Sequence, residues 1–120
     1  MRTRLTCLLV IVAAWIATPL AFHFELLRSV PTSNATLKIS PAIIQLWFSQ
    51  VPAAGVSQVT LSDQRGNVAT SKVAIDDHAK SMTIAPAAPL APGRYTIHWR
   101  GAGDDGHVIS GDIRFTVAGK

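Results

Sequence analysis

Two residues near the C-terminal end of the chain, Asp105 and His107, have the types and the spacing of a metal-ligand pair. In extended backbone, residues i and i+2 face the same side, so the carboxylate of Asp105 and the imidazole of His107 can point to one ion. An Asp-x-His sequence is by itself a weak signal. A metal site therefore requires further donors from elsewhere in the chain.

The other histidines stand at positions 23, 78 and 98 and differ in their predicted surroundings. His78 follows a predicted turn at residues 76–77, which places it on the surface. His98 lies on the face of its predicted strand opposite to Trp99, so it points outward. We expect neither His78 nor His98 to belong to a metal site.

The first 22 residues have the pattern of a secretory signal peptide. Arg2 and Arg4 precede an apolar stretch from Leu5 to Phe22 that ends in small residues. A retained membrane anchor is the alternative, because a span needs about 17 to 25 apolar residues. Thr18 and Pro19 near the end of the stretch favour cleavage. We therefore expect residues 1–22 to be removed and residues 23–120 to form the exported domain.

Cleavage before His23 would make this residue a second source of metal donors. Its free amine and its imidazole can together close a chelate ring on one ion, with loss of a proton from the amine. With Asp105 and His107, the set has three nitrogens and one oxygen, which suits Cu(II) in a tetragonal geometry. Two alternatives stay open: His23 is only the first residue of a frayed terminus, or cleavage after Ala21 leaves Phe22 in front of it.

Composition and charge limit the functions that this domain can have. The chain has 120 residues, of which 48% are hydrophobic and 15% charged, as expected for one globular domain. Without Arg2 and Arg4, nine basic side chains face seven acidic ones, and no block of like charge is present. This charge is too small for a nucleic-acid-binding protein. The single cysteine, Cys7, lies in the signal peptide, so no disulfide stabilises the exported domain.

From Pro31 onward, closely spaced prolines and glycines leave little room for helices, and apolar residues alternate with polar ones. The alternation is clearest at 43–49, 94–100 and 113–117; weaker strands are predicted at 24–29, 36–39, 56–62, 68–75 and 81–84. Turns are expected at 63–66 and 76–77. About seven short strands at this spacing predict an all-β protein, an immunoglobulin-like antiparallel β-sandwich of Greek-key type.

Three segments of the chain resemble the C-terminal half of the CopC-type copper-resistance proteins. They are the run from Pro89 to Arg100, the sequence Asp105-Gly106-His107, and the run from Gly111 to Val117. Within them, Tyr95 and Trp99 have the spacing Tyr-x-x-x-Trp. The N-terminal half also resembles this family, with His23 eight residues before Pro31, then Ser40-Pro41 and the strand from Ile44 to Ser49. The resemblance covers residues 23–120.

The resemblance implies a periplasmic seven-stranded sandwich that binds one Cu(II) ion per chain. The metal ligands would be the amine and side chain of His23 together with Asp105 and His107. The family implies a monomeric copper carrier or buffer in copper resistance or homeostasis, working beside an inner-membrane copper protein of the CopD type. No catalytic turnover is implied.

Three features depart from the family pattern. Some members bind Cu(I) through a methionine-rich loop, whereas the exported domain has only Met82, so no Cu(I) methionine site is expected. Glu25 stands where many members have another histidine, and we expect a solvated or supporting carboxylate there. Phe22 is a poor residue to precede a cleavage site, so cleavage after Ala21 stays open.

Two other classes of function are alternatives. A copper site with an N-terminal histidine also resembles that of the lytic polysaccharide monooxygenases, although 98 residues leave little loop mass for binding a polysaccharide. The other alternative is a metal-free interaction module of the immunoglobulin type, because a fold by itself determines no function.

Overall fold

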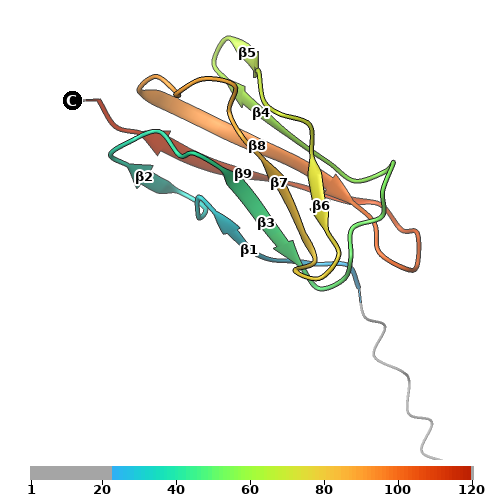
Figure 1. Cartoon of the computed structure of the whole chain (residues 1–120). Coiled ribbons are helices and arrows are strands. Elements are labelled where there is room, and N and C mark those ends of the chain that lie inside the picture. The colour runs from blue at the N-terminus through green and yellow to red at the C-terminus, as the bar shows by residue number, and fades with distance from the viewer. Residues whose placement is uncertain (1–22, 120) are drawn as a thin grey trace, which may run out of the picture.

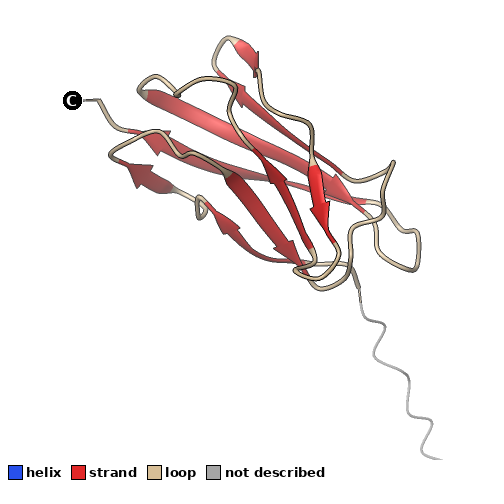
Figure 2. Cartoon of the chain, viewed as in Figure 1, coloured by secondary structure: helices blue, strands red, loops and turns tan. Residues whose placement is uncertain are grey.

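The computed structural model of the chain describes residues 23–119. The predicted signal peptide, with both possible cleavage sites and Cys7, lies outside this range. Residues 23–119 form nine strands and no helix, arranged as a sandwich of two sheets (Figures 1 and 2). The described residues thus include no apolar helix of membrane-spanning length. The strands are β1 (Leu26–Val30), β2 (Ala35–Leu37), β3 (Ile44–Phe48), β4 (Gln58–Asp63), β5 (Gly66–Val68), β6 (Ala74–Asp76), β7 (Ser81–Ile84), β8 (Gly93–Gly101) and β9 (Ile109–Val117).

The two sheets divide the strands in a way that requires repeated crossing between layers. One sheet has the order β1-β3-β7-β6 and the other the order β2-β9-β8-β4-β5. Neighbouring strands are antiparallel except β2 and β9, which pair in parallel over three residues. The predicted all-β sandwich is confirmed, with nine strands in residues 23–119 where about seven were expected.

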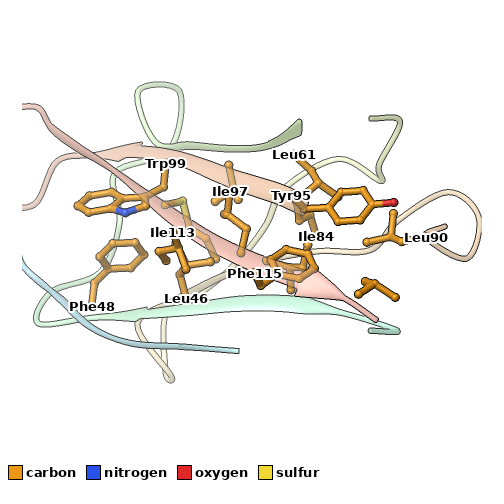
Figure 3. Close-up of a cluster of buried hydrophobic side chains, with 14 of the residues drawn as sticks. Leu46, Phe48, Leu61, Ile84, Leu90, Tyr95, Ile97, Trp99, Ile113 and Phe115 are labelled. Carbon is orange, nitrogen blue, oxygen red and sulfur yellow. The ribbon is translucent and has the colours of Figure 1, made fainter. Parts of the chain in front are cut away.

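Alternating apolar residues of the two long central strands fill the core. In β8, Tyr95, Ile97 and Trp99 are buried while the residues between them face outward. Ile113 and Phe115 of β9 continue the same layer (Figure 3). Strand β3 contributes its own alternation from the opposite sheet. The strands predicted from period-two patterning therefore face the core with the sides that the sequence indicated.

Tyr95 ties the start of β8 to the preceding turn. Its hydroxyl donates a hydrogen bond to the carbonyl of Ala91 at 2.5 Å, and its ring stacks on Phe115 with the centroids 5.4 Å apart. A tyrosine that bonds back to the backbone a few residues upstream also occurs at the corners of immunoglobulin sandwiches. Burial, and secondarily the negative charge of Asp63, raises the pKa of Tyr95 above its ordinary value.

The single strand predicted at 68–75 is wrong. Val68 ends β5 and pairs with Leu61 in the five-stranded sheet, whereas Ile75 lies in β6 and pairs with Met82 in the four-stranded sheet. The chain between them crosses from one layer to the other. Val68 and Ile75 pack against the same hydrophobic core, each from its own sheet. The segment therefore has a core-facing apolar residue on both sides of the crossing. The turn predicted at 63–66 is confirmed, whereas the turn predicted at 76–77 lies at 77–80, directly after β6.

Candidate metal centre

The N-terminal tail, residues 23–25 before β1, is held against the sandwich by a buried aromatic ring. Phe24 is 2% exposed and stacks on Phe48 with the ring centroids 4.6 Å apart. Phe48 in turn packs edge-on against Trp99, with the ring centroids 5.3 Å apart. His23 is exposed and immediately precedes this anchored ring. The fold therefore fixes the backbone next to the predicted N-terminal ligand.

The tail and the loop between β8 and β9 lie at the same end of the molecule. A Cβ atom built on Gly101, the last residue of β8, would lie 2.7 Å from Cε1 of Phe24. Figure 1 shows the start of the described chain close to the β8–β9 loop, with the C-terminus at the opposite end. The segment that carries His23 and the loop that carries Asp105 and His107 are thus neighbours.

The loop itself contains a tight turn at Asp104 and Asp105. The amide of His107 donates to Oδ1 of Asp105 at 3.1 Å, and the amide of Gly106 donates to the carbonyl of Gly103 at 3.1 Å. Gly106 has φ +69°, a conformation that favours glycine. The expectation of extended backbone from Asp105 to His107 is therefore wrong, because an aspartate can bond to the amide two residues on and so stabilise a turn.

Asp105 and His107 are exposed, as is His23. Within residues 23–119, no three or more His, Cys, Asp or Glu side chains are grouped closely enough to hold a metal ion. The structure brings together the two segments that carry the predicted ligands, but it does not make their side chains converge. The ligand set of His23, Asp105 and His107 stays a prediction.

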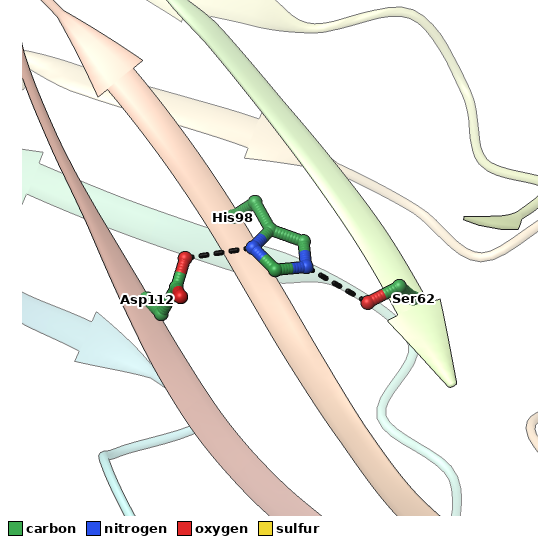
Figure 4. Close-up of polar contacts among 3 residues, drawn as sticks. All are labelled: Ser62, His98 and Asp112. Carbon is green, nitrogen blue, oxygen red and sulfur yellow. Dashed lines mark hydrogen bonds and ion pairs between the residues drawn. The ribbon is translucent and has the colours of Figure 1, made fainter. Parts of the chain in front are cut away.

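His98 faces outward, as predicted, and has two partners that sequence analysis missed. Its Nδ1 lies 2.7 Å from Oδ1 of Asp112 on β9, and its Nε2 lies 2.9 Å from Oγ of Ser62 on β4 (Figure 4). Only the register of the three strands places these residues side by side, with His98 opposite Asp112 in β8 and β9.

The connectivity of Ser62, His98 and Asp112 is that of a serine nucleophile, its base and an orienting acid. Such chemistry also needs backbone N–H groups directed at the reacting oxygen. Here the three residues stand on an open sheet face, where β4, β8 and β9 pair their backbones with one another. We therefore interpret the group as a hydrogen-bonded link across three strands.

His78 is exposed in its turn, as predicted.

The comparison with protein families decides the relationship of this chain. A CopC domain matches residues 26–118, almost the whole described structure. The chain belongs to the CopC family. Members of this family are copper-binding and copper-resistance proteins and not enzymes, which argues against the monooxygenase alternative.

Individual relatives agree in sequence and in fold. Copper resistance protein C of Xanthomonas campestris pv. juglandis is 34% identical over 116 residues, which cover 90% of this chain and 91% of that protein. The crystal structure of PcoC, a methionine-rich copper resistance protein from Escherichia coli, matches with a TM-score of 0.70 and 37% identity, covering 79% of this chain and 98% of PcoC.

A third relative differs in size. Copper transport protein CutJ of Bacillus subtilis is 29% identical over 97 residues, which cover 79% of this chain but only 18% of CutJ. In that protein, a segment similar to this chain is therefore part of a much longer polypeptide.

The methionine content separates this CopC-family chain from its methionine-rich relative. Met82 is the single methionine among residues 23–119 and has a relative exposure of 0% in β7. Its thioether packs in the hydrophobic core and is shielded from solvent. The described residues thus present no surface thioether to a soft metal ion.

Proposed function

We propose that this CopC-family protein is a periplasmic carrier or buffer for Cu(II) that serves copper resistance or homeostasis. One ion would be held per chain by the amine and imidazole of His23 and by the side chains of Asp105 and His107. The protein would be exported by the signal peptide at residues 1–22 and act as a monomer. The observation that supports the proposal is the contact of Phe24 with Gly101, because it puts residues 23–25 beside the loop that carries Asp105 and His107.

The chemistry of the donors favours Cu(II) over Cu(I). Amine and imidazole nitrogens with a carboxylate oxygen suit a divalent ion in a tetragonal arrangement, whereas Cu(I) prefers soft sulfur ligands. Met82 is buried and the exported domain has no cysteine. Small movements of exposed side chains on the anchored tail and loop would bring the donors together around an ion.

A membrane-bound copper protein of the CopD type is the partner that we propose. The match to a short part of the longer copper transport protein CutJ supports this choice, because it links a CopC-like segment to transport within one polypeptide. An exposed site formed by a tail and a loop also allows ligands to be exchanged with a second protein.

The decisive experiment is Cu(II) binding by the full chain expressed and exported in a bacterial cell. The intact mass of the protein purified from the periplasm identifies its first residue, with His23 expected. Equilibrium dialysis should then retain one Cu(II) per chain. Failure to retain Cu(II) would reject the carrier function and favour a metal-free interaction module.

A further inference from the structure

Ser49 is bonded to the N-terminal tail on both sides of Phe24. Its Oγ donates to the carbonyl of His23 at 2.9 Å and accepts from the amide of Glu25 at 2.9 Å. Its own amide donates to the carbonyl of Glu25, also at 2.9 Å. One serine at the end of β3 therefore engages both peptide groups that flank the buried ring.

The next residue, Gln50, holds the loop on the other side. Its Oε1 accepts a hydrogen bond from the amide of Asp104 at 2.9 Å. The side chain lies directly over Gly103, where an added Cβ atom would come within 1.9 Å of the same oxygen. Glycine at position 103 thus permits the approach of Gln50, and this approach fixes the backbone one residue before Asp105.

Ser49 and Gln50 are consecutive, so a single peptide unit separates the residue that holds the tail from the residue that holds the loop. The amide of Ala53, a few residues on, also donates to the carbonyl of Ala102 at 2.8 Å. The segment that follows β3 therefore connects the two halves of the predicted copper site, in addition to the contact between Phe24 and Gly101.

We propose that Ser49 and Gln50 are positioning residues that set the spacing between His23 and the Asp105–His107 turn. The inference rests on the proposed Cu(II)-binding function and adds two residues that need not touch the metal. Chain termini are poorly ordered unless they are tied down. Ser49 holds the tail in place before the ion arrives. Less conformational entropy is therefore lost when the ion binds.

The experiment compares Cu(II) affinity, by competition with a chelator, and the electron paramagnetic resonance spectrum of the Cu(II)-loaded protein exported by the cell. Ser49→Ala should weaken binding by about tenfold, the low end of the effect seen when groups that orient metal ligands are removed. Its spectrum should change because the His23 donors are displaced. Ser49→Thr, which keeps the hydroxyl, should restore both.

Two further variants test the contact between Gln50 and the β8–β9 loop. Gln50→Leu removes the acceptor of the Asp104 amide, and Gly103→Ala pushes the Gln50 side chain away without removing it. Both should weaken Cu(II) binding and alter the spectrum in the same way. Ser62→Ala is the matched control, because it removes a serine hydroxyl bonded to a side chain on an outer sheet face. It should leave affinity and spectrum unchanged.

The outcomes separate this inference from the function on which it rests. If the unaltered protein retains no Cu(II), the proposed function fails. If it binds Cu(II), but Ser49→Ala and Gly103→Ala keep its affinity and its spectrum, the function stands and the positioning role is overturned. Thermal unfolding of each metal-free variant shows whether it is folded. Should Ser49→Ala not fold, Gln50→Leu and Gly103→Ala decide the question, because both are expected to weaken Cu(II) binding only if the positioning role is correct.

Discussion

Phe24 lies directly on the backbone of Gly101, with Cε1 of the ring 2.7 Å from the position that a Cβ atom on Gly101 would occupy. This contact joins the start of the described chain to the last residue of β8. It buries the ring and leaves the neighbouring His23 exposed beside the loop. The absence of a side chain at position 101 is thus a structural requirement for the candidate site.

Replacement of Gly101 by alanine should loosen the tail. The methyl group would force the Phe24 ring out of its place, at a cost of about 1 to 3 kcal/mol in the free energy of unfolding. Urea unfolding measures this loss, and hydrogen exchange at the Glu25 amide should accelerate as its bond to Ser49 weakens. Gly119→Ala is the control, because a Cβ there would lie 3.9 Å from its nearest neighbour. Equal stability of both variants would contradict the assigned contact.

Trp99→Ala should destabilise the fold by about 3 to 5 kcal/mol, the usual cost of truncating a large buried aromatic residue. Trp99 is 8% exposed and packs on Phe48, while the neighbouring Arg100 points to solvent. Denaturant unfolding of Trp99→Ala and Arg100→Ala separates the two faces of β8. Arg100→Ala should change stability by no more than about 0.5 kcal/mol. A stable Trp99→Ala protein would place the ring outside the core.

His107→Ala should weaken Cu(II) binding by about 100-fold or more, which corresponds to about 2.8 kcal/mol of binding free energy or more. The metal-free protein should stay folded, because the side chain is exposed. Chelator competition measures the affinity and thermal unfolding tests the fold. His98→Ala, which breaks the contacts with Asp112 and Ser62 at the surface, should leave Cu(II) affinity as it is. A comparable loss in both variants would show that the sites were assigned wrongly.

Tyr95 should make the stability of the protein fall at alkaline pH. Because its pKa is raised in the folded state, the unfolded chain loses the phenolic proton first as pH rises. The stabilising effect is therefore complete below the ordinary pKa of 10.0 and is lost as pH rises through the folded pKa.

Tyr95→Phe tests this dependence. It should cost about 1 kcal/mol near neutral pH through loss of the bond to Ala91. The gap between the two proteins, measured by denaturant unfolding from pH 7 to above pH 10, should then narrow on the alkaline side. A gap that is constant across this range would argue that the phenol titrates normally.

Some features of this protein follow from local sequence alone. Period-two alternation predicts which side of a strand is buried, so Ile97 and Trp99 could be placed in the core and His98 on the surface without a structure. The same local pattern misled at Val68 and Ile75, because two strands on opposite layers bury their apolar residues in one core. Periodicity carries no information about which sheet a residue joins.

The candidate site shows the same division. The sequence by itself determined the chemical types of the predicted donors at positions 23, 105 and 107, and the family to which the motifs of the chain point. Only the tertiary structure decided that the tail reaches the β8–β9 loop, that a turn at Gly106 replaces extended backbone, and that Ser49 and Gln50 hold both segments. These relationships depend on packing and hydrogen bonds between residues far apart in the chain, which no local pattern encodes.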